Sequence, residues 1–231
     1  EYIKALMRFN SKINPVPLKR LGAGYHSLDT RTKLASATGI RTAMANKDNI
    51  SGLLPDNCLN IIKNHTTIEY NDFSTVLGSK LLSMDTLDHI EGINQDLSNR
   101  IVNNKYNFTD IETFIPMLQS KNYTYSAISR ALLHIILDIK TDGLKEFISN
   151  NYVNYAMILG FNKNTGVLSE ISKSTKIPLV SKFATFYKEA DYNQRKMLDI
   201  NLKADSLYRM IYMNKTNETL PTEFQRQIII K

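Results

Sequence analysis

The residues whose types and spacing best suit chemistry lie in the first fifth of the chain. Residues 36–41, Ser-Ala-Thr-Gly-Ile-Arg, place two hydroxyl groups and an arginine at the expected start of a helix. The first turn of a helix has free backbone N–H groups and partial positive charge, which favour phosphate oxygens. Arg41, one turn further on, can add a charged fork to the same anion. Taken alone, the segment is also explained as a capped helix beside an arginine.

A second basic segment lies just upstream. Lys19 and Arg20 come at the end of a run, residues 16–21, that is expected to form a strand, and Gly-Ala-Gly-Tyr-His follows it. Ligands bind at the carboxyl ends of strands in open α/β sheets, so Arg20 is expected near the same crevice as residues 36–41. The simpler alternative is a surface arginine, because the nearby glycines form neither a Walker nor a Rossmann pattern.

No catalytic centre and no metal site are predicted within the chain. A single cysteine, Cys58, can form neither an internal disulfide nor a CxxC zinc motif. The four histidines are scattered and form no HxGH motif; they are His26, His65, His89 and His134. No nucleophile therefore has a recognisable base beside it in the sequence.

Composition and charge narrow the classes of protein. Of the 231 residues, 42% are hydrophobic and 22% charged, which is typical of a globular protein. No run approaches the ~18 apolar residues of a membrane span, and no signal peptide is evident, so a cytoplasmic protein is expected. The formal charge of +7 is segregated: +6 over residues 1–48, −4 over 49–150 and +5 over 151–231. Such basic segments attract the phosphates of nucleotides or RNA, although many soluble proteins are mildly basic.

Helices are expected to position the candidate residues. Residues 2–10 are expected to form a short helix, and residues 22–33 a loop. Thr38 is expected to cap a helix that runs to residue 46, because its hydroxyl can accept a first-turn N–H. The chain begins at Glu1 rather than at methionine, with helix from the start, which indicates a segment of a longer protein.

The middle of the chain, residues 58–140, has helical periodicity throughout. A capping box at residues 109–112 is expected to start one helix, which Pro116 should shorten. The clearest helix is expected over residues 125–139, with an apolar face formed by Ile128, Leu132, Ile135, Ile136 and Ile139. A polar stripe on the same helix suggests RNA contacts at Arg130 and His134, although a solvated face is the better explanation of the stripe.

The last third of the chain changes character. Strands at residues 152–161 and 177–180 are expected to enclose a helix at 164–172, which makes a small β-α-β unit. A long helix is expected from 192 to 213. The predicted fold is therefore mainly α with a small α/β component at about residues 150–182.

Two of these segments together resemble a known family. Residues 19–26, Lys-Arg-Leu-Gly-Ala-Gly-Tyr-His, followed by residues 35–41, Ala-Ser-Ala-Thr-Gly-Ile-Arg, resemble the bacterial tRNA(Met) cytidine acetate ligase family. Residues 1–6, 123–125 and 128–135 resemble that family as well, whereas Ser126 or Ala127 stands where the family often has an additional arginine. The resemblance covers most of the chain and is looser after about residue 140.

The resemblance implies an enzyme that uses ATP, with Mg2+, to activate acetate as acetyl-adenylate. The acetyl group would then form N4-acetylcytidine at the wobble position of elongator tRNA(Met). It implies ATP contacts at Arg20, Leu21, Ser36, Thr38 and Arg41. Residues 1–55 would be the end of a Rossmann-like nucleotidyltransferase domain, and residues 56–231 a helical, tRNA-binding domain. The family's HxGH motif lies upstream of these segments, so the chain alone is expected to be inactive.

Two alternatives stay open on the sequence. One is a nucleotidylyltransferase that acts on a small phosphorylated substrate, because the Ser-x-Thr-x-Ile-Arg element is shared by many such enzymes. The other is a non-catalytic RNA-binding module. A requirement for tRNA separates the first alternative from the acetate ligase.

Overall fold

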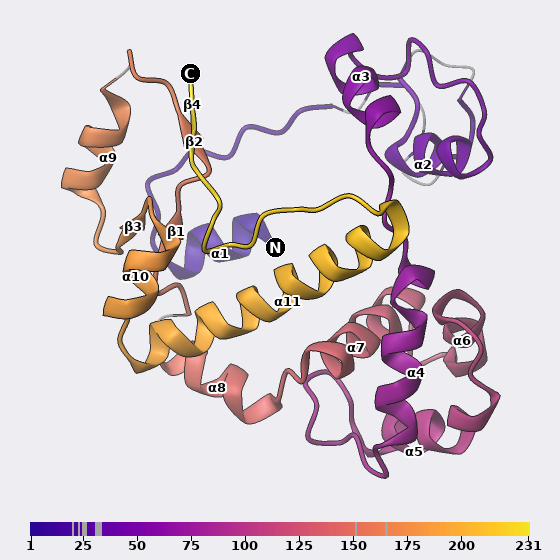
Figure 1. Ribbon diagram of the computed structural model, residues 1–231. Coiled ribbons are helices and arrows are strands. Elements are labelled where there is room, and N and C mark those ends of the chain that lie inside the picture. Colours follow the sequence, from indigo (N-terminus) through magenta and orange to yellow (C-terminus); the bar gives the residue numbers. More distant parts are fainter. Residues whose placement is uncertain (20, 23, 25–26, 31–33, 151, 165) are drawn as a thin grey trace. The chain divides into compact units, whose positions relative to one another are not determined.

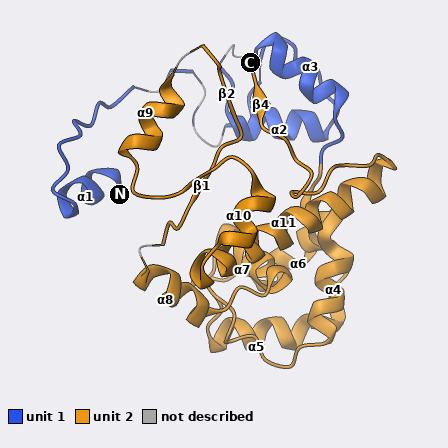
Figure 2. Cartoon of the chain, turned by 60° about the vertical axis from the view of Figure 1, so that its left-hand side comes forward, with its two compact units in different colours: residues 1–67 blue, residues 68–231 orange. Residues whose placement is uncertain are grey.

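The chain divides into two units, residues 1–67 and 68–231, which Figure 2 shows in separate colours. The computed structural model describes residues 1–19, 21–22, 24, 27–30, 34–150, 152–164 and 166–231. Helices make up most of the second unit and are the regular structure of the described part of the first, and the strands of the described residues are two residues long (Figure 1). The expected mainly helical fold with a small α/β component is confirmed.

The first unit contains three short helices, α1 (Tyr2–Arg8), α2 (Ala37–Ala45) and α3 (Asp56–Asn64). Helix α1 confirms the expectation for the chain's start, although it buries none of its residues. The strand expected over residues 16–21 is wrong for the described residues 16–19 and 21, which are irregular. A strand needs a hydrogen-bonded neighbour, and these residues have none within the described part of the unit.

The core of the second unit lies among four helices, α4 (Ser74–Leu82), α5 (Gln95–Asn104), α6 (Ile111–Leu118) and α7 (Tyr125–Leu137). Helix α7 packs against both α4 and α6. Its expected apolar face is confirmed at four positions, whereas Ile139 lies beyond the helix end and is only half-buried. The largest buried side chains of this core include Leu77, Leu81, Leu97, Ile101, Phe114, Ile115, Ile128 and Leu132.

The start of α6 differs from the expected capping box. Asp110, rather than Thr109, is the N-cap, and its Oδ1 accepts the Thr113 N–H at 2.9 Å. That hydrogen bond lowers the pKa of Asp110. A carboxylate is the stronger acceptor and also suits the positive end of the helix, so it displaces the neighbouring hydroxyl. Helix α6 ends two residues after Pro116, which confirms the expected shortening.

The remaining elements follow α7. In order they are α8 (Thr141–Ser149), β1 (Ala156–Met157), β2 (Gly160–Phe161), α9 (Val167–Ser174), β3 (Leu179–Val180), α10 (Phe183–Glu189), α11 (Tyr192–Thr216) and β4 (Ile229–Ile230). Strands β1 and β3 pair in parallel on either side of α9 in the sequence, which confirms the β-α-β unit. The parallel pair of β2 and β4, and helices α8 and α10, were not expected. None of the described helices is long and apolar enough to cross a membrane.

Helix α11 joins the two ends of the second unit. It begins with a capping box between Asp191 and Gln194 and packs against α7, where Leu207 reaches the core. Near its carboxyl end the Lys215 ammonium lies 2.8 Å from the Asp72 carboxylate, just before α4. The long helix is therefore confirmed and is fastened at several points along its length.

We expect Leu132→Ala to destabilise the protein by about 2–5 kcal/mol, because the side chain is 1% exposed and its removal leaves a cavity. Leu82→Ala is the matched control, since Leu82 is 60% exposed on α4. Urea unfolding of both variants measures the difference. Equal losses of stability would contradict the placement of the core.

The ion pair at Asp72 predicts a dependence of stability on pH. Burial opposes ionisation of Asp72, but the Glu69 N–H and the Lys215 ammonium outweigh it, so its pKa lies below the ordinary value of 3.8. A lowered folded pKa gives stability that is present above about pH 4 and is lost as the pH falls through the folded pKa.

Asp72→Asn should therefore lower the free energy of unfolding by about 0.5–1 kcal/mol at pH 7, a small value because the pair is partly exposed. The difference in free energy of unfolding between this variant and the wild type should disappear at acidic pH. Asp88→Asn, at an exposed carboxylate, serves as the control. Urea unfolding at a series of pH values tests this, and a gap that persists unchanged at pH 3 would refute it.

Candidate functional site

Ser36 organises the turn that precedes α2. Its side chain is fully buried, and its Oγ accepts the Gly39 N–H at 2.9 Å while donating to the Ser27 carbonyl at 2.5 Å. Ser36 is therefore the N-cap, and the expected cap at Thr38 is wrong. Ser36 still has extended backbone angles, whereas Thr38 already lies in the first helical turn. The Ser36 hydroxyl is occupied within the protein and shapes the turn.

Two glycines allow close backbone packing around this turn. A Cβ added at Gly39 would come within 3.1 Å of the Ser27 carbonyl oxygen, and one at Gly22 within 2.6 Å of the Leu34 Cβ. Gly22 also has a φ of +84°, which other residues rarely adopt. The backbone at Gly22 is thus packed against the segment that leads into α2. Leu21, next to it, exposes 71% of its side chain.

The groups left for an anion lie on the first turn of α2. The N–H groups of Ala37 and Thr38 donate to no acceptor among the described residues, and the Thr38 hydroxyl makes no hydrogen bond there. Arg41 is exposed and likewise has no partner in the described part of the chain. Residues three apart are neighbours on a helix surface, so Thr38 and Arg41 share one face. Arg20 lies outside the described residues.

This arrangement can bind an oxyanion, and its described residues bring no paired nucleophile and base together. Two free N–H groups, a hydroxyl and a guanidinium all donate hydrogen bonds, and the helix start adds partial positive charge. Within the described residues, no three His, Cys, Asp or Glu side chains lie close enough together to hold a metal ion. The turn is therefore a candidate phosphate-binding element.

The two residues expected to contact RNA differ in their surroundings. Arg130 is exposed and has no partner among the described residues. His134 is half-buried, and its Nδ1 donates to the Glu91 carbonyl at 2.7 Å. The same loop is held by a second bond, from the Glu91 N–H to the Ile139 carbonyl at 2.9 Å. His134 thus stabilises the loop that contains Glu91, and Arg130 is the more accessible of the two for contact with RNA.

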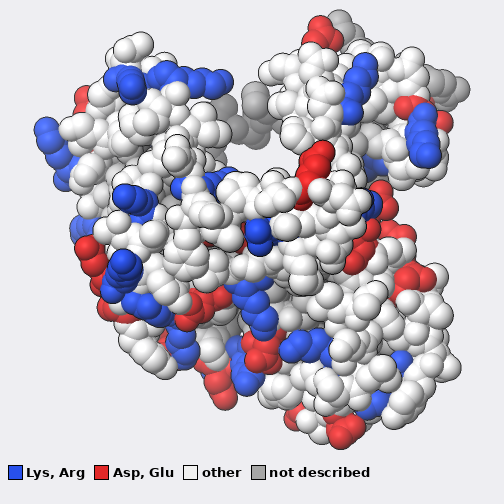
Figure 3. All heavy atoms as spheres, in the orientation of Figure 1, with Lys and Arg blue, Asp and Glu red and all other residues white. Residues whose placement is uncertain are grey.

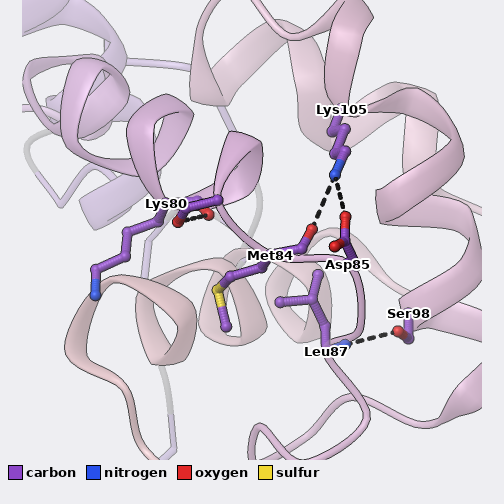
Figure 4. A network of polar contacts seen from close by, with 7 residues as sticks. Lys80, Met84, Asp85, Leu87, Ser98 and Lys105 are labelled. Atoms are coloured by element: carbon purple, nitrogen blue, oxygen red, sulfur yellow. Dashed lines mark hydrogen bonds and ion pairs between the residues drawn. The ribbon is translucent and has the colours of Figure 1, made fainter.

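A buried lysine stabilises the neighbouring loop between α4 and α5. Lys105 is 6% exposed, and its Nζ donates to the Met84 carbonyl at 3.0 Å and to the Asp85 carboxylate at 3.2 Å. Figure 4 shows this contact and, apart from it, the Lys80 side chain, which extends away from Asp85. Nothing in the sequence distinguishes Lys105 from the exposed lysines, so this role was not predicted.

Basic side chains are unevenly distributed between the two units. Residues 1–67 contain ten Lys and Arg against four Asp and Glu, whereas residues 68–231 contain nineteen against eighteen. In the second unit the cations are nevertheless grouped. Figure 3 shows several of them, with a few carboxylates, in the middle of the view where α11 passes the junction of α7 and α8.

Comparison with known proteins identifies the family. A model of the HIGH nucleotidyl transferase family matches residues 1–223. Curated tRNA(Met) cytidine acetate ligases from Thermoanaerobacter sp. (strain X514) and Clostridium acetobutylicum are 32% and 30% identical to the chain, over 94% and 100% of it. The matches cover 55% and 56% of those relatives, so the chain spans about half their length.

Solved structures give the same picture of the fold. Crystal structures of Thermotoga maritima TmcAL, one apo and one bound with alpha-thio ATP, match 99% of this chain with TM-scores of 0.85 and 0.82. The matches cover 58% and 57% of those chains, at 21% sequence identity, which shows a shared fold. Because the family model matches residues 1–223, nearly the whole of this chain, the chain belongs to the HIGH nucleotidyl transferase family.

Proposed function

We propose that this chain is part of an ATP-dependent ligase that forms N4-acetylcytidine at the wobble position of elongator tRNA(Met). Residues 1–55 would contribute the rear of the ATP-binding domain, and residues 56–231 would bind tRNA. The observation that carries the proposal is the match to curated tRNA(Met) cytidine acetate ligases along 94–100% of this chain. The structure of TmcAL bound with alpha-thio ATP supports ATP as the nucleotide.

The reaction would have two steps. An acetate oxygen attacks the α-phosphorus of ATP, which forms acetyl-adenylate and releases pyrophosphate. The cytidine N4 then attacks the acetyl carbon, loses a proton and releases AMP. In both steps negative charge develops on phosphate oxygens of the leaving group. Mg2+ is expected to accompany the ATP. Preorganised donors stabilise such charge.

The residues of α2 have a defined part in this scheme. Arg41 and the Thr38 hydroxyl would donate to phosphate oxygens of ATP, together with the free N–H groups of the first turn. Ser36 would keep the turn in shape rather than touch the nucleotide, because its hydroxyl is buried and occupied. Leu21 would add an ATP contact from beside Gly22, whose backbone lies against Leu34. Arg20, outside the described residues, is proposed as an ATP contact on the family resemblance alone.

Acetylation of tRNA(Met) by the full-length protein tests the function directly. Acetylcytidine should form only when ATP, acetate and tRNA are all present. Transfer of a nucleotidyl group to a small phosphorylated substrate without tRNA would favour the alternative enzyme. The comparisons give no support to the expectation that residues 1–231 are inactive on their own, so this chain is assayed beside the full-length protein.

Arg20→Ala and Arg41→Ala should each weaken ATP use by the full-length protein by about 10- to 100-fold. A charge-assisted hydrogen bond contributes about 1.5–3 kcal/mol, and each variant removes one such donor. The measurement is the ATP dependence of acetyl-adenylate formation. Arg8→Ala, at an exposed arginine of α1, makes the same chemical change as a control. Wild-type kinetics in both test variants would eliminate the proposed ATP contacts.

The chain should bind tRNA with an affinity that falls steeply with salt. Each phosphate neutralised by Lys or Arg releases counterions, so log K decreases linearly with log salt. Titration of tRNA(Met) into the chain at low and high salt measures this slope. Failure to bind even at low salt would remove the proposed RNA role of residues 56–231.

A further inference from the structure

Lys140 and Lys203 lie at the carboxyl end of α7, and Lys80, on the adjacent α4, is near enough to Lys203 for their charges to interact. Lys80 lies on α4, Lys140 between α7 and α8, and Lys203 on α11. The Lys203 Nζ donates to the Leu137 carbonyl, the last residue of α7, at 2.7 Å. Both α4 and α11 pack against α7. We call Lys80, Lys140 and Lys203 the lysine trio.

One carboxylate partly balances the trio. Asp138, which ends α7 in the left-handed conformation, lies 3.8 Å from the Lys140 Nζ. The trio and Asp138 alone carry a formal charge of +2. With the other charged side chains that line the adjoining cavity, the five lysines and four aspartates of this region sum to +1. Both Lys140 and Asp138 are more than 40% exposed, so an anion can reach them from solvent.

The fold explains one of the three lysines and not the other two. A cation at the carboxyl end of a helix is favourable, which accounts for Lys203. Partial burial lowers the pKa of Lys203, Lys80 and Lys140 lower it further, and Asp138 opposes them. Like charges held together raise the free energy of the folded chain, and a bound anion would remove that repulsion.

A cavity of about 620 Å³ adjoins the trio and shares Asp138 and Lys140 with it. Its volume is in the range of pockets that hold small organic molecules. Ile139, Leu144 and Ile200 give it apolar lining. Its polar lining includes Lys145, Lys196, Asp88, Asp142 and Asp199, and the carboxylates among them can accept hydrogen bonds from the amino groups of a base. The exposed ring of His89 also lines it, and the His89 carbonyl accepts the Thr141 N–H at 3.1 Å, which fixes that wall.

We propose that the lysine trio binds backbone phosphates of tRNA and that the adjoining cavity receives an unstacked nucleotide from a single-stranded part of it. Phosphates need exposed cations, and proteins recognise RNA loops by stacking splayed bases on aromatic or histidine rings. Cations beside a partly apolar cavity with a histidine wall combine both requirements. The inference rests on the proposed tRNA function and names the site within residues 68–231.

The test is tRNA binding by the double variant Lys80→Gln/Lys140→Gln across a series of salt concentrations. Lys203 is left in place because it caps α7. Loss of two phosphate contacts should lower the slope of log K against log salt by about 2 and weaken binding at low salt by at least about 10-fold. Lys121→Gln/Lys173→Gln makes the same charge change elsewhere: Lys121 precedes the opposite end of α7, and Lys173 lies on α9.

The outcomes separate this inference from the proposed function. If the wild-type chain does not bind tRNA, the proposed RNA function fails. If it binds and the trio variant binds equally well, or loses no more than the control, the trio is not the site. Thermal unfolding of all variants confirms that they are folded.

His89→Ala tests the cavity separately. It should weaken binding by about 10-fold with an unchanged salt slope, because stacking involves no counterion release. The substitution keeps the backbone carbonyl that holds Thr141, so the cavity wall should persist. Unchanged affinity would overturn the nucleotide part of the inference.

Discussion

The second unit depends on the burial of the apolar face of α7. Ile128, Leu132 and Ile135 are almost fully buried against neighbouring helices, which fixes both the position and the rotation of α7. Because the helix cannot rotate, its last carbonyl faces Lys203, and the turn at Asp138 directs the chain into α8. Hydrophobic burial thus determines where polar groups meet at one end of the helix.

In the first unit, close backbone packing rather than a large hydrophobic core determines where the polar groups lie. Gly22 and Gly39 have no side chain where a Cβ would meet other atoms, and the Ser36 hydroxyl accepts the buried N–H of Gly39. With the Ser36 hydroxyl occupied, the remaining donors of the turn, at Ala37 and Thr38, have no acceptor among the described residues and can serve a ligand. The turn therefore separates groups that build it from groups that can bind an anion.

Much of the fold could be predicted where the hydrophobic pattern extends over many residues. The faces of α7 and α11 extend over several turns, and the β-α-β unit has strand-forming residues on both sides of a helix. Helices α8 and α10, of nine and seven residues, give short periodic signals and were not predicted; α2 and α9 are as short, but their neighbouring cap or strand signals marked them. The strand expected at residues 16–21 depended on a partner that local sequence cannot supply.

The candidate sites were predicted in part, for a related reason. Residues 36–41 are contiguous, so a helix start with an arginine one turn later could be recognised, although the choice between Ser36 and Thr38 as cap required the backbone angles. His134 could not be separated from Arg130, because its bond to Glu91 crosses 43 positions of sequence. The lysine trio extends from residue 80 to 203, and only tertiary packing brings it together.

The length of α11 has a consequence for how the second unit unfolds. At 25 residues it extends for roughly 37 Å, and it gives Leu207 to the core around α7 while Leu198 is buried elsewhere along it. The Lys215 ion pair holds it near its carboxyl end, and the hydrogen bond that the Tyr187 hydroxyl donates to the Asp199 carboxylate holds its amino-terminal half. If either end of α11 detaches from the unit, the apolar surface that this helix covers becomes exposed. Residues 68–231 should therefore open as one cooperative block, with amide protons of α7 and α11 exchanging at a common slow rate.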